Sequence, residues 1–248
     1  MTNSLIDLPT TGKPRGFSLL ETAVVLVVFG LLAGGIVKTL GAQHEQARIG
    51  EARAQLASIR EALIGFALVY GRLPCPATPE LPANDNQAGL EALVCIADCP
   101  SGHLTCPREH GVVPWQTLGV AATDPWGNRL TYFVDRDFSK PLSPDDMTAG
   151  LRSHIRLDSA GRANIQERFG TNTLSGIPVL IVSHGPRALG AYTSNGLQHP
   201  GATGDEAENA DSDLTFIAHP PDDSFDDVLT WLPTTILKNR LVSVGKLP

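Results

Sequence analysis

Gly16-Phe17-Ser18-Leu19-Leu20-Glu21-Thr22-Ala23-Val24-Val25 begins the stretch that decides the fold, and its apolar character continues to Val37. Between residues 17 and 37 the only polar side chains are those of Ser18, Glu21 and Thr22. A helix of about 20 apolar residues crosses a bilayer, so this run is long enough. A signal peptide is the weaker alternative, because its apolar core is only about 7–15 residues long. Residues 17–37 are therefore predicted to form a transmembrane helix segment.

The lone carboxylate of Glu21 sits near the start of this apolar run. A charge in hydrocarbon is costly, so an acid at such a position indicates a function by default. Lys13 and Arg15 lie just upstream and favour a cytoplasmic N-terminus. Most of the chain is then expected outside the cytoplasm.

Gly16-Phe17-Ser18-Leu19-Leu20-Glu21 resembles the prepilin processing site of type IV pilins and type II secretion pseudopilins. In that family a membrane peptidase cuts after the glycine and methylates the new terminal amine. The resemblance implies a leader of residues 1–16, cleavage between Gly16 and Phe17, and N-methylation of Phe17. It also implies an assembly role for Glu21, whose carboxylate would pair with the terminal amine of a neighbouring subunit and so offset its burial cost. In the unassembled monomer the same carboxylate can reach the membrane interface instead.

A second helical pattern follows, and residues 38–71 are predicted to form an amphipathic stalk helix. Its apolar positions recur three or four residues apart; they are Ile49, Ala52, Leu56, Ile59, Leu63, Phe66 and Tyr70. Gly71 is expected to cap this helix, and Pro74 prevents its continuation. We expect the stripe to pack on the chain's own globular domain, residues 72–248, rather than to form an independent coiled coil.

Four cysteines lie in one short stretch, at Cys75, Cys95, Cys99 and Cys106. An extracytoplasmic setting favours two disulfides, and four cysteines allow three pairings. Nearest-neighbour pairing, Cys75–Cys95 with Cys99–Cys106, is preferred. The alternative is zinc, since Cys95, Cys99, His103 and Cys106 offer four ligands.

Strand patterns dominate residues 72–248. The turn Asp124-Pro125-Trp126-Gly127-Asn128 leads into an expected strand at 130–134, and this turn also resembles pseudopilins. Further strands are expected at 154–157, 179–183, 214–218 and 228–232, a hairpin turn at 158–161, and a last short helix from Thr234 to Val244. The predicted fold is α+β: a long N-terminal helix on a mainly antiparallel sheet.

An acidic loop at 204–213 is the one candidate cofactor site. Asp205, Glu208, Asp211 and Asp213 could offer oxygen ligands to calcium, and some pseudopilins hold calcium in a C-terminal loop. A solvated acidic loop without metal is the competing interpretation, and no other cofactor is expected. Ser183-His184-Gly185 is the nearest approach to a catalytic triplet, but neighbouring side chains on a strand point to opposite faces, so no catalytic residues are expected.

The predicted function is a structural subunit, in a minor position, of a type II secretion pseudopilus or a type IV pilus-like filament. The expected partners are other pilin or pseudopilin subunits, the prepilin peptidase, the inner-membrane assembly platform and membrane lipid. A net charge of −7 without a basic patch makes a nucleic-acid partner unexpected. We expect a single pass through the inner membrane, an N-terminus that is cytoplasmic before processing, and a C-terminal domain in the periplasm or an extracellular filament. The alternative is an anchored periplasmic enzyme or binding protein.

Overall fold

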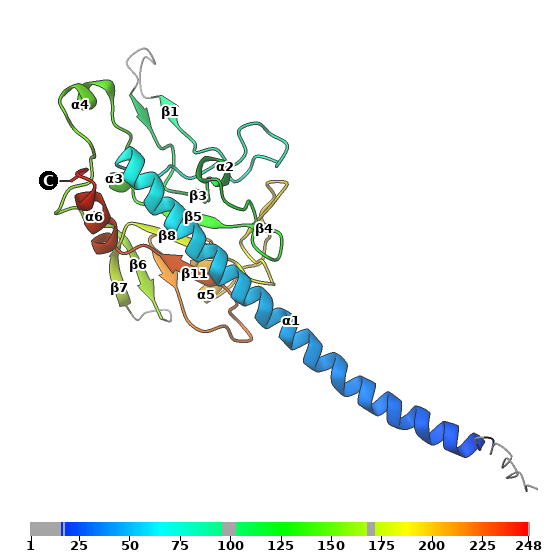
Figure 1. Ribbon diagram of the computed structural model, residues 1–248. Helices are drawn as coiled ribbons and strands as arrows, with labels where there is room; N and C mark the ends of the chain where they lie inside the picture. The colour runs from blue at the N-terminus through cyan, green and yellow to red at the C-terminus, as the bar shows by residue number, and fades with distance from the viewer. Residues whose placement is uncertain (1–15, 17, 96–102, 168–171, 248) are drawn as a thin grey trace, which may run out of the picture. The chain divides into compact units, whose positions relative to one another are not determined.

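The computed structural model describes residues 16, 18–95, 103–167 and 172–247 (Figure 1). It divides into two compact units, Met1–Gln46 and Ala47–Pro248, which are taken separately below. A single helix, α1 (Leu19–Tyr70), contributes residues to both units. The chain is thus helical from Leu19 to Tyr70, through both of the segments that were predicted to be helical.

In the second unit, α1 buries the predicted apolar stripe. Ala52, Leu56, Ile59 and Leu63 are each at most 1% exposed, whereas Tyr70, the last stripe position, is 55% exposed. Gly71 ends the helix with a φ of 71° and donates its N–H to the Ala67 carbonyl at 2.8 Å. A side chain at position 71 would also collide with the Arg152 carbonyl oxygen, so glycine is required twice over.

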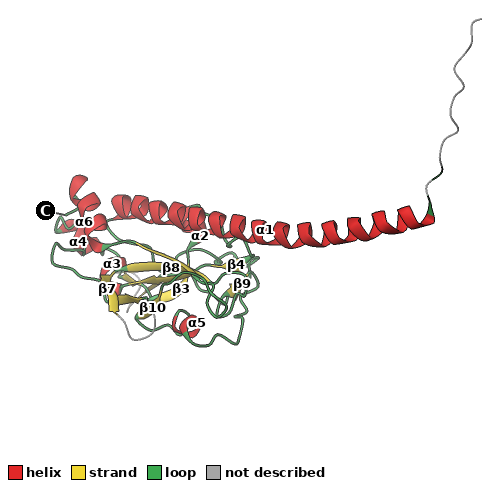
Figure 2. Ribbon diagram, turned by 90° about the horizontal axis from the view of Figure 1, so that it is seen from below, coloured by secondary structure: helices red, strands yellow, loops and turns green. Residues whose placement is uncertain are grey.

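A four-stranded antiparallel sheet lies beneath this part of the helix (Figure 2). Its order is β11-β8-β5-β3, from Val228–Trp231, Val179–Ser183, Thr131–Val134 and His110–Val112. Alternate residues face opposite sides of the sheet: Tyr132 and Ile181 join the core beneath α1, while Phe133 and Leu180 join a second core. Because both faces are covered, β8 reads as a continuous apolar run.

The second core is closed by a three-stranded sheet of order β10-β6-β7, formed by Thr215–Ile217, Ala163–Gln166 and Asn172–Ile177. β6 pairs with β7 antiparallel and with β10 parallel. Two short antiparallel pairs complete the strands, β1 (Val94–Cys95) with β2 (Leu104–Thr105) and β4 (Asn128–Arg129) with β9 (Tyr192–Thr193). The unit therefore has three layers, one helical and two of sheet.

Short helices fill the connections between these strands. They are α2 (Trp115–Leu118), α3 (Arg136–Ser139), α4 (Pro144–Thr148) and α5 (Asp205–Glu208). The predicted last helix is α6 (Thr234–Ser243), followed by Gly245 at a φ of 67°. Leu237 and Leu241 of α6 pack into the core beneath α1.

One strand prediction is wrong: residues 154–157 form no strand, and no hairpin follows at 158–161. The segment is held by side-chain contacts instead of a ladder. Ser153 donates its hydroxyl to the Gly71 carbonyl at 2.6 Å and accepts the Ile155 N–H at 3.0 Å. The strands expected at 130–134, 179–183, 214–218 and 228–232 are confirmed as β5, β8, β10 and β11, and the α+β prediction is confirmed with them.

Candidate assembly helix and its supporting domain

The first turn of α1 carries the residues that the prepilin resemblance singles out. The Ser18 hydroxyl accepts the Leu20 N–H at 3.2 Å, and the Ser18 carbonyl accepts the Thr22 N–H at 3.1 Å. Serine in this position satisfies amide groups that the helix leaves unpaired. Glu21 is exposed in this turn, where the helix dipole favours a negative charge. Gly16 is also exposed, and Phe17 lies outside the described residues.

The first turns of α1 expose apolar side chains on every side. Nine of the thirteen residues from Leu19 to Leu31 are large hydrophobics that are 48% exposed or more. They are Leu19, Leu20, Val24, Val25, Leu26, Val27, Val28, Phe29 and Leu31. A helix that is apolar all round is normally covered by lipid or by other protein. A search of the described residues finds no helix whose length and hydropathy suffice to cross a membrane.

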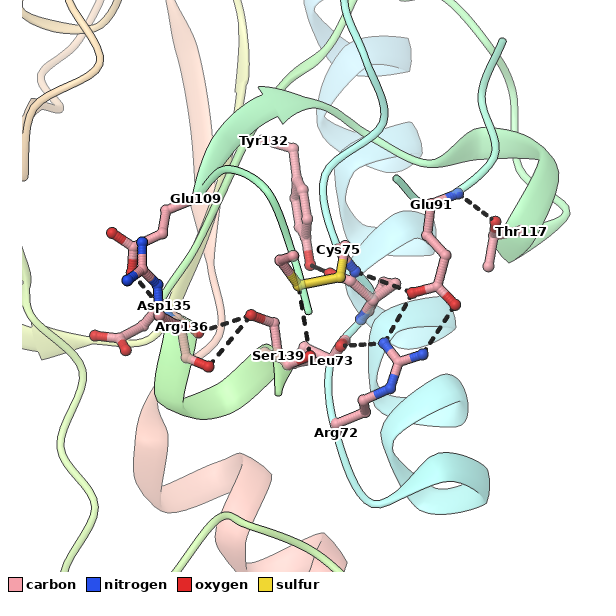
Figure 3. Close-up of a disulfide and its surroundings, with 12 residues drawn as sticks. Arg72, Leu73, Cys75, Glu91, Glu109, Thr117, Tyr132, Asp135, Arg136 and Ser139 are labelled. Atoms are coloured by element: carbon pink, nitrogen blue, oxygen red, sulfur yellow. Dashed lines mark hydrogen bonds and ion pairs between the residues drawn. A yellow bond between two sulfur atoms is a disulfide. The ribbon is translucent and has the colours of Figure 1, made fainter. Parts of the chain in front are cut away.

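A disulfide joins Cys75, just beyond the end of α1, to Cys106, just before β3 (Figure 3). The preferred pairing of Cys75 with Cys95 and of Cys99 with Cys106 is therefore wrong. The zinc alternative fails as well, because the sulfur of Cys106 is bonded to Cys75 and cannot ligate a metal as a thiolate. Cys95 is also disulfide-bonded, and Cys99 lies outside the described residues.

A buried polar network surrounds this disulfide and fixes the exit from α1 (Figure 3). Arg72 makes a two-point ion pair with Glu91 at 2.8 and 2.9 Å, and Glu91 also accepts the Cys75 N–H at 3.1 Å. The Tyr132 hydroxyl donates to the Pro74 carbonyl at 3.1 Å, and burial raises the pKa of Tyr132 well above its ordinary value. Two-point arginine–carboxylate pairs combine strength with directional control. The loop after the helix is thus fixed to the main sheet.

The acidic loop brings three of its four candidate calcium ligands together. Carboxylate oxygens of Glu208, Asp211 and Asp213 lie within 4.8 Å of one another. Asp205 stands outside this group and contacts the Nε2 atom of His219 at 3.2 Å. Burial, with the nearby Asp213 and Asp211 charges, raises the pKa of Glu208. A cation among the three oxygens would relieve this repulsion, so the residues fit calcium in ligand type.

A second acidic cluster, which the sequence did not indicate, is centred on Arg187. Its guanidinium pairs with Glu206, which is 2% exposed, and with Asp226 at 3.0 Å. Asp227 completes the cluster and is 3% exposed. Burial and the charges of Asp226 and Asp227 raise the pKa of Glu206 to about 7. Arg187, which follows the end of β8, thus joins Glu206 of α5 to Asp226, which precedes the start of β11.

Several known proteins are similar to this chain in sequence. A family model described as the prokaryotic N-terminal methylation motif matches residues 12–37, which include Gly16, Phe17 and Glu21. The type II secretion system core protein G of Pseudomonas aeruginosa is 32% identical over 122 residues, 49% of this chain and 75% of that protein. The Escherichia coli K12 protein of the same name is 32% identical over 123 residues, 44% of this chain and 83% of that protein. This chain belongs to the type IV pilin and pseudopilin family. No solved structure matches it.

The Ser183–His184 pair of this pseudopilin is buried among polar partners. Ser183 donates its hydroxyl to Asp124 at 2.7 Å, and the His184 Nε2 atom lies 2.9 Å from the Thr131 hydroxyl. Both residues are at most 1% exposed. Burial also raises the pKa of Asp124. These contacts tie β8 to β5 and to the turn before β4, which is a structural role.

Proposed function

We propose that this pseudopilin is a structural subunit of a type II secretion pseudopilus and assembles through the first turns of α1. The observation that carries the proposal is the exposed apolar surface of Leu19–Leu31, interrupted near its start by the Glu21 carboxylate. Lipid would cover this surface before assembly, and the equivalent surfaces of neighbouring subunits would cover it afterwards. The relatives named above support the secretion system over the type IV pilus.

In this proposal the prepilin peptidase removes residues 1–16 and methylates Phe17. The new terminal amine of one subunit then pairs with Glu21 of its neighbour. An unpaired carboxylate in an apolar bundle is strongly unfavourable, so only the register that brings the two charges together would be stable. The remaining partners are the inner-membrane assembly platform and membrane lipid. The domain after α1 would lie in the periplasm.

Two details of the subunit stay proposals of their own. The matched relatives align with about half of this chain, and a domain enlarged in this way would suit a minor position in the filament. Quantifying the copy number per filament tests this point. Calcium, if bound, would be held by Glu208, Asp211 and Asp213 and would neutralise their repulsion.

A structural role, rather than an enzymatic one, is the better-supported function. The burial of Ser183 and His184 leaves their side chains no access to a substrate. A catalytic role would instead need convergent titratable groups that line an accessible cavity.

The test compares the full-length protein with Glu21→Gln and Glu21→Leu variants in a host that supplies the secretion machinery. N-terminal sequencing should begin at N-methylated Phe17 in all three, while filaments should form only with Glu21 intact. Glu61→Gln is the matched control, because Glu61 is an exposed glutamate of the same helix and its ion pair with Arg60 is long, at 4.0 Å. Recovery of uncut protein beginning at Met1, with an active peptidase present, would overturn the processing step. Filaments built from Glu21→Leu would overturn the assembly step.

A further inference from the structure

A cavity of about 610 Å³ opens beside the C-terminal end of α1, between residues 150–158 and 245–247. Its walls are fixed to the helix. The Ser153 hydroxyl donates to the Gly71 carbonyl at 2.6 Å, and the Lys246 Nζ atom donates to the Val69 carbonyl at 2.8 Å. The cavity therefore has a defined place relative to residues 69–71 of α1.

The lining of this cavity is basic and apolar. Arg152, Arg156 and Lys246 contribute three cations against one acid, Asp158. Arg152 is exposed and has no ion-pair partner among the described residues. Arg156 pairs with Asp158 at 3.3 Å, but their side chains are 78% and 79% exposed, so this pair contributes little.

Apolar surface adjoins these charges. Leu151 and Leu157 also line the cavity and are 41% and 57% exposed. This combination fits a peptide segment that carries a carboxylate next to a small, rigid apolar group. The chain carries a net charge of −7, so acidic side chains outnumber basic ones and a cationic cavity departs from the overall balance.

Such a segment occurs at the other end of the same unit, at residues 220–224. Pro220, Pro221, Asp222, Asp223 and Ser224 are all exposed. The two prolines restrict the backbone, and the Asp222 carboxylate accepts the Ser224 N–H at 2.8 Å. Arg187 donates to the Asp223 carbonyl at 3.1 Å. This bond holds the backbone at residue 223 in place, while Asp223 itself is exposed.

The two surfaces are offset along α1. Pro220 and Pro221 share a surface groove with Arg53, whereas the basic cavity adjoins Val69. Sixteen residues of helix separate positions 53 and 69, which is about 24 Å at 1.5 Å per residue. A contact between these two different surfaces, made once per pair of copies, is heterologous and can repeat from copy to copy along an open filament.

We propose that the Pro220–Ser224 segment of a second copy of this chain docks in the cavity, with Asp223 of that copy facing Arg152 and its prolines against Leu157. The inference rests on the proposed filament role and specifies which surfaces of consecutive subunits meet. The proposed contact gives the filament a direction, because the acidic segment and the basic cavity lie at different ends of the unit. Salt weakens it, because both charges are solvent-exposed before docking.

The test places a photo-activated cross-linking residue at position 157 of the full-length protein and identifies the cross-linked peptide by mass spectrometry. The expected product is a ladder of oligomers joined through residues 220–224. Arg152→Glu and Asp223→Arg should each reduce the yield by about tenfold, because each places like charges in contact, and the two changes combined should restore it. Arg240→Glu is the control: it makes the same change of charge on an exposed arginine of α6 outside the cavity and should have no effect.

Each outcome bears on the proposal. Cross-links to another protein, to lipid or to other residues of this chain would overturn it. A cross-linking yield that neither charge-reversal variant lowers would overturn it as well. Thermal unfolding of each variant separates lost docking from lost folding, and restoration by the combined variant cannot arise from misfolding. If wild-type filaments form without the ladder, the docking inference fails alone; if wild-type filaments do not form, the filament role itself fails.

Discussion

Removal of the Cys75–Cys106 disulfide should destabilise the globular domain by several kcal/mol. The two cysteines are 31 residues apart in the sequence. The entropy that this cross-link removes from the unfolded chain corresponds to about 3.7 kcal/mol at 25 °C. For a domain of this size, about 1 kcal/mol corresponds to about 2–4 °C in melting temperature, so the double variant Cys75→Ser/Cys106→Ser should melt about 7–15 °C lower.

The assay is thermal unfolding of the full-length protein in detergent, followed by circular dichroism. Cys75 is 0% and Cys106 6% exposed, so reductant should act slowly on the folded wild-type protein and reach this bond mainly through unfolding. Each single variant should be at least as unstable as the double one, because it leaves an unpaired thiol beside a new hydroxyl. A double variant that melts within about 2 °C of wild type would refute the reasoning, since the loop closed by the bond would then contribute almost nothing.

Three further perturbations probe other parts of the structure. Leu63→Ala should cost about 2–5 kcal/mol in the free energy of unfolding, because Leu63 is fully buried on the face of α1 that packs on the sheet. Val69→Ala, at a residue of α1 that is 64% exposed, should change it by about 0.5 kcal/mol or less, and equal effects would contradict the packing. The folded-state pKa of Glu206 is raised to about 7, above its unfolded value of 4.5, so this group favours the folded state below pH 4.5 and loses that contribution as the pH rises through 7. Glu206→Gln should therefore remove this component from the melting temperature measured between pH 4 and 8, and an unchanged pH profile would count against it. Calcium should raise the melting temperature of wild type but not of Asp211→Asn/Asp213→Asn, and a chelator that produces no shift would remove the calcium proposal.

Patterns with one dominant cause could be predicted from the sequence. The stripe from Ala52 to Leu63 repeats at helical spacing because one face of α1 covers a sheet. The apolar run of β8 reflects burial on both faces, and Gly71 marks the helix end because only glycine tolerates both its φ and its contact with Arg152. Each of these signals is local in sequence.

The features that escaped prediction depend on contacts between distant segments. Nearest-neighbour pairing of the cysteines ignored the β1–β2 ladder, which pairs Cys95 with Leu104 and returns the chain to Cys75 two residues later, at Cys106. The Arg187 cluster joins residues 187, 206 and 226, whose spacing follows no motif. The segment 154–157 has strand composition, yet Ser153 holds it at the end of α1 instead of in a sheet.

The residues proposed for assembly and the residues that bury the core of the domain are different residues of α1. Among the residues of α1 whose burial is described, the buried ones begin at Ala52, whereas the exposed apolar surface and Glu21 lie within Leu19–Leu31. Twenty residues of sequence lie between Leu31 and Ala52, and the two positions belong to different compact units. Changes at sites that share no contacts should add in their free energies. A Glu21 variant should therefore lose assembly with an unchanged melting temperature, and a Leu63 variant should lose melting temperature while its helix start remains competent to pair. Coupled losses in both variants would mean that the domain and the proposed assembly surface depend on each other, contrary to the additivity expected of sites that share no contacts.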